Sequence, residues 1–500
     1  MSRSEVNRCV YVAKVLALGL FSAQVLATIQ VYLSNADLYR TLTVIKDAGY
    51  LPIPNERIMH RLQEFSPAFF GGLFFTLSVG AGLSILSLAA AWIWDRSLFR
   101  SRVFLVVSLL LWIGCIVVVN REGFCPMVTA YFLVIPPVVC SAALRWMPAQ
   151  ARHGAWVNRM VYFIPIALLA ALWTFEMDGH LFSDIRDHLL LTNPIGKKVN
   201  DFYYKYTLYP AEVFKSLDQK ILKTCSIEKI RAQSIMPYLE RGLLDHDYLI
   251  VSGDATDDLK ITQEDNILVF ENEERAILRA PVKAFVSRPG AVLKEFSQKS
   301  DRYAFFRRFT FLSLLIGFPI ILYIFFYTVL CFVSRLFLDS MASSVIASLL
   351  CFLLGIALLG HLHHNRGRKI EVRGLADTLA SECWQERVAA LKFIGDNGLD
   401  VGDFQAYKGM LKSPHIAERY WLARVLGMSR RPGTYQDLLA LLDDPHPNVV
   451  SMAFYALGQR GDMRAIREIK GRIETSDDWY NQWHAYKALR ALGWKQSRLR

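Results

Sequence analysis

Long runs of apolar residues dominate the hydropathy pattern of the chain. A helix needs about 20 apolar residues to cross the hydrocarbon core, because lipid offers no hydrogen-bond partner to an open backbone. Seven segments meet this requirement, of which the fifth is the shortest. They run approximately from Val15 to Leu33, Ala68 to Trp94, Val103 to Val119, Met127 to Trp146, Val161 to Phe175, Phe309 to Val333 and Ser343 to Leu362.

The first apolar segment has two interpretations. Arg3, Arg8 and Lys14 precede it, and Ala27 offers a small residue for cleavage, as in a secretory signal. The run continues to Leu33, however, which is long enough for a permanent anchor. We favour the anchor, and either interpretation leaves a multi-pass protein.

The interiors of most spans lack ionisable residues. In the second, third, fifth, sixth and seventh spans Asp, Glu, Lys and Arg occur only at the ends. Pumps and coupled transporters place such groups at mid-depth, so the pattern disfavours coupled transport. Small residues such as Gly80 and Gly82 let helices approach closely, and we expect them to pack within the chain rather than form a dimer interface.

The last two spans fix the relative placement of the two soluble parts. Only about eight residues, Arg335 to Ala342, join these spans, so the chain returns to the side from which it entered. Residues 176–308 and residues 363–500 are therefore expected on the same face of the membrane.

Two sets of basic residues disagree about which face this is, because Lys and Arg accumulate in cytoplasmic loops. The first set lies in the loops after the second and fourth spans, and it would place both soluble parts outside the cytoplasm. The second set flanks the last two spans and favours a cytoplasmic location for the same parts. Long domains translocate with little regard to charge, so we favour the extracytoplasmic side of a bacterial inner (plasma) membrane. The sets are Arg96, Arg100, Arg102, Arg145, Arg152 and Arg159, and then Arg302, Arg307, Arg308, Arg366, Arg368 and Lys369.

A cluster of tyrosines follows the fifth span, within reach of Lys197, Lys198 and Lys205. Tyrosine suits the membrane interface, with its ring in the lipid and its hydroxyl in the headgroups. We therefore predict a helix at the membrane interface, and prefer this interpretation to stacking on nucleic-acid bases. The residues concerned are Tyr203, Tyr204, Tyr206 and Tyr209.

The segment 176–308 has the pattern of a small α+β module. It contains no GxGxxG, P-loop, GxSxG or HExxH motif. We therefore assign no catalytic residue and favour a non-enzymatic protein. The expected elements are a helix over 228–244 and strands over 247–251, 259–262, 267–271 and 276–285.

The C-terminal region contains internal repeats. Four segments superpose on a Gly that follows an apolar residue, at Gly395, Gly427, Gly458 and Gly493, with spacings of 32, 31 and 35 residues. Apolar residues one, two, four and five positions earlier predict a buried helix that the Gly terminates. The stretch DDPHPNVVSMAFYALGQRGD resembles the short HEAT-like repeats of phycobilin lyases and many scaffolds, over about residues 371–495.

The resemblance implies an α-solenoid that binds a protein partner, without specifying which. Aromatic and Arg side chains are enriched at interaction hot spots, although aromatics at helical spacing are also common in cores. The partner-binding candidates are Trp384, Arg387, Arg419, Tyr420, Trp421, Trp483 and Tyr486.

The net charge and the potential metal ligands give little further indication of function. The 57 Lys and Arg exceed the 45 Asp and Glu by 12, but no basic run or nucleic-acid motif occurs, so we expect lipid rather than nucleic acid as the partner of these charges. The HLHH run at His361, His363 and His364 would need a further ligand to hold a metal. We expect no metal or cofactor, and any small-molecule ligand stays unknown.

The sequence thus predicts a multi-pass α-helical membrane protein with a small α+β module and a C-terminal α-solenoid. We interpret it as a membrane-anchored scaffold or docking protein. A channel or transporter component and a membrane-bound, lyase-like assembly factor remain the alternatives. The expected domains are a membrane domain at 1–175, the module at 176–308, a membrane hairpin at 309–362 and the repeats at 363–500.

Overall fold

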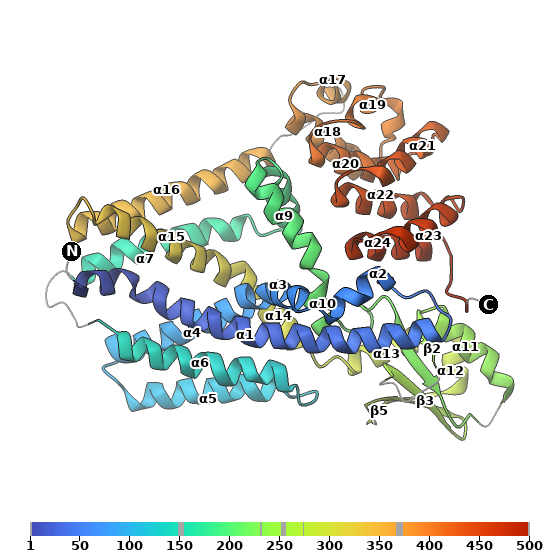
Figure 1. Cartoon of the computed structure of the whole chain (residues 1–500), viewed down its shortest axis with the longest axis horizontal. Coiled ribbons are helices and arrows are strands. Elements are labelled where there is room, and N and C mark those ends of the chain that lie inside the picture. Colours follow the sequence, from blue (N-terminus) through green and yellow to red (C-terminus); the bar gives the residue numbers. More distant parts are fainter. Residues whose placement is uncertain are drawn as a thin grey trace.

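The computed structural model describes residues 3–148, 155–230, 233–251, 257–273, 275–366 and 374–498. A bundle of long helices occupies one end of the molecule, and a small sheet and an array of short helices lie together at the other end (Figure 1).

The bundle contains the predicted apolar segments. Six helical segments in the described part of the chain are long and apolar enough to cross a membrane. The fifth predicted span falls in α7, whose described apolar part, Phe163–Phe175, is shorter. The bundle helices are α1 (Arg3–Asp47), α3 (Phe65–Phe75), α4 (Ala81–Trp92), α5 (Arg102–Val119), α6 (Pro126–Trp146), α7 (Ala155–Phe175), α14 (Ala304–Leu312), α15 (Phe318–Ser334) and α16 (Ser340–Arg366).

Helix α1 is the central element, in contact with α3, α4, α6 and α15. At a rise of 1.5 Å per residue its 45 residues extend about 68 Å, more than twice the hydrocarbon thickness. Its C-terminal half therefore projects beyond the bundle and runs beside the sheet (Figure 1).

Small residues bring the second apolar segment against its neighbours. A Cβ atom on Gly80 would lie 2.4 Å from the Cβ of Ala23, and one on Gly82 would lie 2.2 Å from the Oγ of Ser313. Packing of these glycines within the chain is thereby confirmed.

The module is a five-stranded mixed sheet with strand order β2-β1-β3-β4-β5. Strand β1 pairs in parallel with β2 and β3, and the remaining pairs are antiparallel. Leu243, Phe285 and Phe296 from the covering helices share one core with Ile261 and Phe270 of the sheet. The elements are β1 (Lys223–Ile227), β2 (Tyr248–Ile250), β3 (Leu259–Glu264), β4 (Ile267–Asn272), β5 (Arg275–Pro281), α11 (Met236–Leu244), α12 (Val282–Ser287) and α13 (Pro289–Lys299).

Three elements of the module differ from the prediction. Strand β1 was not expected, because its Lys-Thr-Cys-Ser-Ile sequence has little periodicity. The helix expected over 228–244 forms only from Met236, after a short 3₁₀ turn. The strand expected over 276–285 ends at Pro281, where α12 begins.

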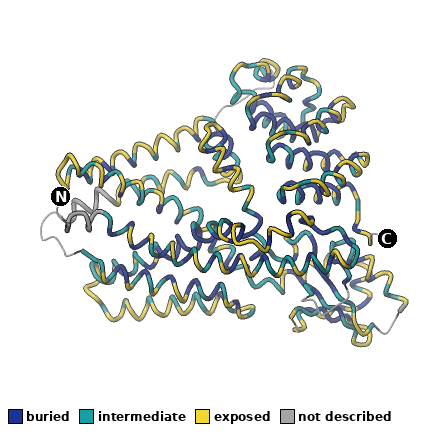
Figure 2. The backbone as a smooth tube through the Cα atoms, viewed as in Figure 1, coloured by how far each residue is buried: buried dark blue, intermediate teal, exposed yellow. Residues whose placement is uncertain are grey.

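The C-terminal array alternates outer and inner helices, and the inner helices α18, α20, α22 and α24 stack in succession. Their buried faces, dark blue in Figure 2, form one continuous core. The outer helices are α17 (Leu375–Leu379), α19 (Tyr407–Met410), α21 (Pro432–Ala440) and α23 (Ala465–Thr475), and the inner ones are α18 (Trp384–Asn397), α20 (Ile416–Leu426), α22 (Pro447–Arg460) and α24 (Trp479–Ala491).

Two of the four repeated glycines lie at helix ends as expected, since Gly427 is the C-cap residue of α20 and Gly493, with φ of 84°, follows α24. The other two have a different role. Gly395 and Gly458 lie inside α18 and α22, which end instead at Gly398 and Gly461, with φ of 65° and 75°. A Cβ on Gly458 would lie 3.0 Å from the Cα of Ala488 on the next inner helix. Close stacking, rather than helix termination, therefore explains Gly458.

Candidate interaction site at the junction of array and bundle

The array docks on the short helices that connect the bundle to the module. These are α8 (Leu181–Ile185), a π-helical turn (Arg186–Leu190), α9 (Pro194–Tyr206) and α10 (Leu208–Phe214). In Figure 1, α9 descends beside the inner helices of the array.

Adjacent aromatic side chains on α20 hold a charged pair from the π-helical turn. Trp421 Nε1 donates a hydrogen bond of 2.8 Å to Asp187 Oδ2. The Arg186 guanidinium lies 3.7 Å from the centroid of the Tyr420 ring and pairs with Asp187 at 2.8 Å. Asp187 is fully buried. Because buried charges are costly unless paired, these contacts tie the array to the turn.

A lysine on α18 extends this network. Lys392 Nζ lies 3.0 Å from Asp184 Oδ1 and 3.8 Å from Asp187 Oδ2. Burial lowers the pKa of Arg186, but the Asp187 carboxylate and the Tyr420 and Tyr204 side chains together outweigh burial and raise this pKa well above its usual range. Burial, together with Lys392, lowers the pKa of His188. At neutral pH the junction therefore holds a charged Arg186 and an uncharged His188.

The two candidate arginines join one repeat to the next. Arg387 pairs with Glu418, and Arg419 pairs with Asp444 at 2.6 Å. Each guanidinium also donates to a backbone carbonyl of its own repeat, at Ser381 or Ser413. Their equivalent positions in the sequence thus correspond to equivalent structural contacts.

The candidate tryptophans make different contacts. Trp384 is half-buried and stacks on His415, with ring centroids 5.1 Å apart. Trp483 stacks on Tyr480 at 6.2 Å, and Lys487 Nζ lies 3.6 Å from its ring centroid. Trp384 also stacks on His188, with ring centroids 6.4 Å apart, so it contacts the same π-helical turn as Tyr420 and Trp421, whereas Trp483 packs on a ring of its own helix.

The last inner helix makes a second connection, to the module. Tyr486 donates a hydrogen bond of 2.5 Å to Asp247 Oδ1, and Arg490 lies 3.1 Å from the same carboxylate. Burial raises the pKa of Asp247, against the opposing effects of Tyr486 and Arg490.

A third connection involves the loop after α1. Asn55 N donates to Gln482 Oε1 at 2.8 Å, and Asn55 Nδ2 donates to the carbonyl oxygen of Ile473 at 2.9 Å. Asn55 is buried, so these bonds replace contacts with water that the loop has lost.

The predicted interfacial tyrosines have different environments. Tyr203 is exposed. Tyr204 packs on Tyr480 of the array, with ring centroids 4.9 Å apart, and Tyr209 is buried against Trp479 at 5.0 Å. Tyr206 lies against Phe70 of α3. Two of the four rings thus contact α24 of the array.

Sequence reasoning did not identify several residues of the junction. Arg186 and Asp187 lie in the amphipathic run 180–191, and this apolar setting was the available indication that their charges would be buried. Asn55 and Asp247 lie in loops, and their sequence context contains no comparable indication.

Two of the three histidines of the HLHH run, His361 and His363, have partners in the chain. His361 Nε2 lies 3.3 Å from the carbonyl oxygen of His188, and His363 Nδ1 lies 3.0 Å from Glu176 Oε1. Within the described ranges, no group of three or more His, Cys, Asp or Glu side chains is placed to hold a metal ion.

Comparison with known proteins concerns the array alone. Residues 406–490 match the family model of HEAT repeats. No curated protein and no solved structure matches the chain. The C-terminal array is therefore composed of HEAT repeats, which generally mediate protein–protein interaction.

Proposed function

We propose that this chain is a membrane-anchored scaffold that holds its HEAT repeats in a fixed position at one membrane surface. One observation carries the proposal: the array contacts three other parts of the chain. These are the π-helical turn Arg186–Leu190, the module and the loop after α1. An array tethered only by its linker would not need buried polar contacts with the bundle.

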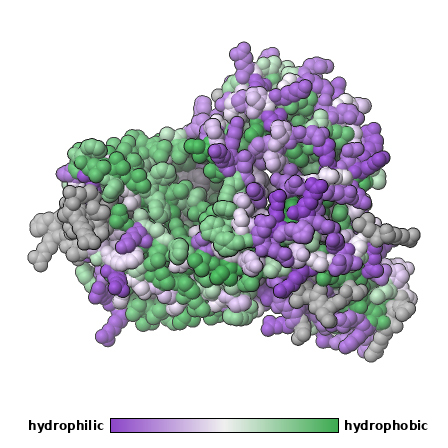
Figure 3. All heavy atoms as spheres, viewed as in Figure 1, coloured by the Kyte–Doolittle hydropathy of each residue, from purple (hydrophilic) through white to green (hydrophobic). Residues whose placement is uncertain are grey.

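The surface of the bundle supports membrane anchoring. Exposed apolar side chains cover its outer helices, which appear green in Figure 3. A contiguous apolar surface of this size is rarely left in contact with water. Examples on α5, α15 and α16 are Leu110, Leu111, Phe326, Val329, Leu349 and Leu353.

The arrangement also supports one side for both soluble parts. The short connections around 97–101 and 335–339 lie at the end of the bundle that is remote from the sheet and the repeats (Figure 1). Arg96, Arg100 and Arg102 lie at this remote end, which favours the cytoplasm for it. The module and the repeats are accordingly proposed to be extracytoplasmic.

The partner-binding surface is proposed at exposed side chains on α22 and in the loops after α20 and α22, rather than at the junction. Trp421, Tyr420 and Tyr486 already contact other parts of this chain. By contrast, Met428, Tyr455 and Met463 are exposed. We call these three residues the Met-Tyr edge. Met and Tyr are enriched at protein interfaces.

Chemical cross-linking in membranes tests the proposal. Photo-cross-linking residues in place of Met428 or Met463 should trap one partner protein, whereas the same residue at exposed Glu382 on the far repeat should not. Release of the chain by alkaline carbonate would contradict anchoring. Failure to trap any protein at Met428 and Met463 would contradict the Met-Tyr edge.

A further inference from the structure

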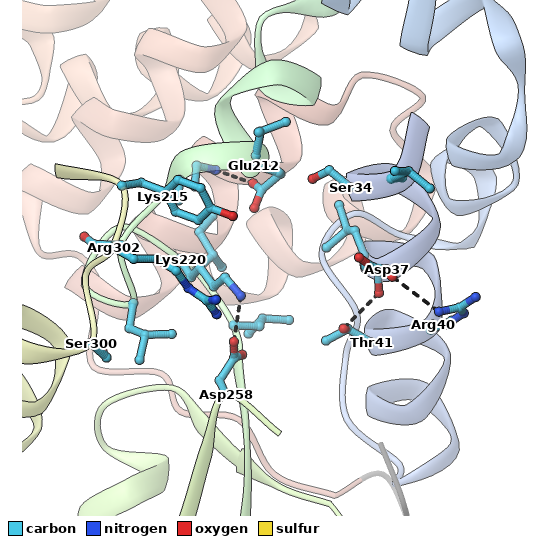
Figure 4. Close-up of a pocket in the computed structure, with 18 of the residues that line it drawn as sticks. Ser34, Asp37, Arg40, Thr41, Glu212, Lys215, Lys220, Asp258, Ser300 and Arg302 are labelled. Atoms are coloured by element: carbon cyan, nitrogen blue, oxygen red, sulfur yellow. Dashed lines mark hydrogen bonds and ion pairs between the residues drawn. The ribbon is translucent and has the colours of Figure 1, made fainter. Parts of the chain in front are cut away.

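A cavity of about 530 Å³ lies where α1, the module and the last helix of the array meet. Small-molecule sites usually have volumes of about 300–1,000 Å³. One wall is the projecting part of α1, with Ser34, Asp37 and Thr41, and the opposite wall belongs to the module side (Figure 4).

The cavity lies at the end of the bundle. Its lining includes Cys125–Val128, at the start of α6, and Arg302 and Tyr303, which directly precede α14. If the bundle crosses a membrane, as proposed above, these helix ends mark the boundary between hydrocarbon and water. The cavity then lies at the depth of the lipid headgroups.

Ion pairs line the module side of the cavity. Lys215 pairs with Glu212, and Lys220 Nζ lies 2.6 Å from Asp258 Oδ1 (Figure 4). Arg302 pairs with Glu273. The cavity therefore presents cations and carboxylates side by side, an arrangement suited to a ligand that carries both signs of charge.

Carboxylates outnumber cations around the cavity. The cations are Arg40, Lys215, Lys220 and Arg302, against six carboxylates. Arg307, which pairs with Asp301 from outside the lining, reduces the excess to one. This balance disfavours an anionic ligand and favours one that brings an amine. The carboxylates belong to Asp37, Glu212, Asp257, Asp258, Glu273 and Asp301.

A buried polar atom in the lining lacks a partner. Gln30 on α1 is 4% exposed, and its Oε1 has no hydrogen-bond partner within the described residues. A buried acceptor without a donor destabilises the folded chain, because it has lost its hydrogen bonds to water. An ammonium group of a ligand would satisfy it.

We propose that this cavity binds the headgroup of a phosphoethanolamine lipid. The phosphate accepts hydrogen bonds from the lysine and arginine side chains of the ion pairs, and the ammonium group donates to Gln30 and the carboxylates. Leu33 and Val128 line the cavity on the bundle side, where the acyl chains enter the membrane. The inference rests on membrane insertion of the bundle.

Native mass spectrometry of the full chain in detergent tests the proposal. The chain is mixed separately with dioleoyl phosphatidylethanolamine, phosphatidylcholine and phosphatidylglycerol at equal concentrations. We expect one phosphatidylethanolamine per chain, retained at least fivefold more than phosphatidylglycerol. Equal retention of the three lipids would overturn the proposal. If equimolar free phosphoethanolamine displaced the lipid, the claim that the ligand is a lipid would be wrong, and a soluble phosphoamine would be the ligand.

Two cavity variants separate binding from folding. Gln30→Leu and Asp37→Asn should each reduce the preference for phosphatidylethanolamine, whereas Thr43→Val, on the same helix outside the lining, should not. If Gln30 were only a buried core residue, Gln30→Leu would leave lipid retention unchanged and would raise the thermal midpoint. Carbonate extraction of the same membranes shows separately whether the chain is inserted, so failure of the lipid proposal is distinguishable from failure of anchoring.

Discussion

The α-carbon of Gly427 faces the backbone of Ala456 so closely that a Cβ on Gly427 would lie 2.7 Å from the Ala456 carbonyl oxygen. Gly427→Ala therefore requires α20 and α22 to separate. Overpacking of this kind costs about 1–3 kcal/mol. We expect a lower thermal midpoint for the purified chain, measured by scanning calorimetry in detergent.

Gly395 provides the matched control, because it occupies the equivalent position one repeat earlier. A Cβ there would meet Val425 Cγ1 at 3.5 Å, an ordinary contact. Gly395 lies inside α18, where replacement of Gly by Ala stabilises a helix by about 0.5–1 kcal/mol. Gly395→Ala should thus have an equal or higher midpoint, and equal losses in both variants would refute the stacking argument.

Trp421→Phe tests the connection between the array and the bundle. The substitution removes one donor to the buried Asp187 carboxylate, which keeps its ion pair with Arg186. A hydrogen bond to a charged group contributes about 1.5–3 kcal/mol. Amide hydrogens in α20 and residues 184–191 should then exchange faster with deuterium, measured by mass spectrometry.

Trp384→Phe is the comparison for this variant. Trp384 makes stacking contacts with His415 and His188, which a Phe ring retains. In Trp384→Phe, amide hydrogens of residues 184–191 should exchange with deuterium at nearly the rate of the parent chain. Equal acceleration in the two variants would indicate a general loss of packing rather than loss of the hydrogen bond.

The features that the sequence predicted are those set by local periodicity. The apolar segments and the spacing of the Gly residues identified the bundle and the repeats, because burial of one helix face imposes its own pattern. The junction could not be predicted in the same way. Asp187 and Trp421 are 234 positions apart, and a pairing between distant polar residues leaves no periodic trace in either segment.

The candidate partner residues illustrate the same limit. Arg387 and Arg419 have equivalent positions, but equivalence does not reveal whether a side chain meets a partner or the next repeat. The folded array shows that both side chains form ion pairs with the next repeat, at Glu418 and Asp444. The exposure of Met428 and Met463 likewise depends on the positions of the loops after α20 and α22, which the sequence does not specify.

Acid should destabilise the array through His484. Burial, reinforced by Lys487, lowers the pKa of His484 from 6.5 to about 4. The unfolded chain therefore takes up the proton first as the pH falls. The stabilisation from neutral His484 is fully present above pH 6.5 and is lost progressively towards pH 4, amounting to about 3 kcal/mol.

The pH dependence of the thermal midpoint between pH 4 and pH 7 measures this contribution. His484→Phe keeps a ring beside Tyr480 and Trp483 but does not titrate, so its midpoint should fall less on acidification than that of the parent chain. His180→Gln, at an exposed position, should retain the parent slope. Parallel curves for all three proteins would exclude His484 as the titrating group.

Single cysteines tested with a membrane-impermeant maleimide report the topology of the bundle. In a background with the native cysteines replaced, Ser101→Cys and Ser340→Cys probe the short connections at one end. Glu122→Cys and Thr475→Cys probe the end that bears the module and the repeats (Figure 1). In intact cells only the latter pair should react, and all four should react after the membrane is opened with detergent. Reaction of the opposite pair would reverse the proposed orientation while leaving the bundle intact.

Reaction at Ser101 without reaction at Ser340 would show that the number of spans between them is odd, because two positions on one side must be separated by an even number of crossings.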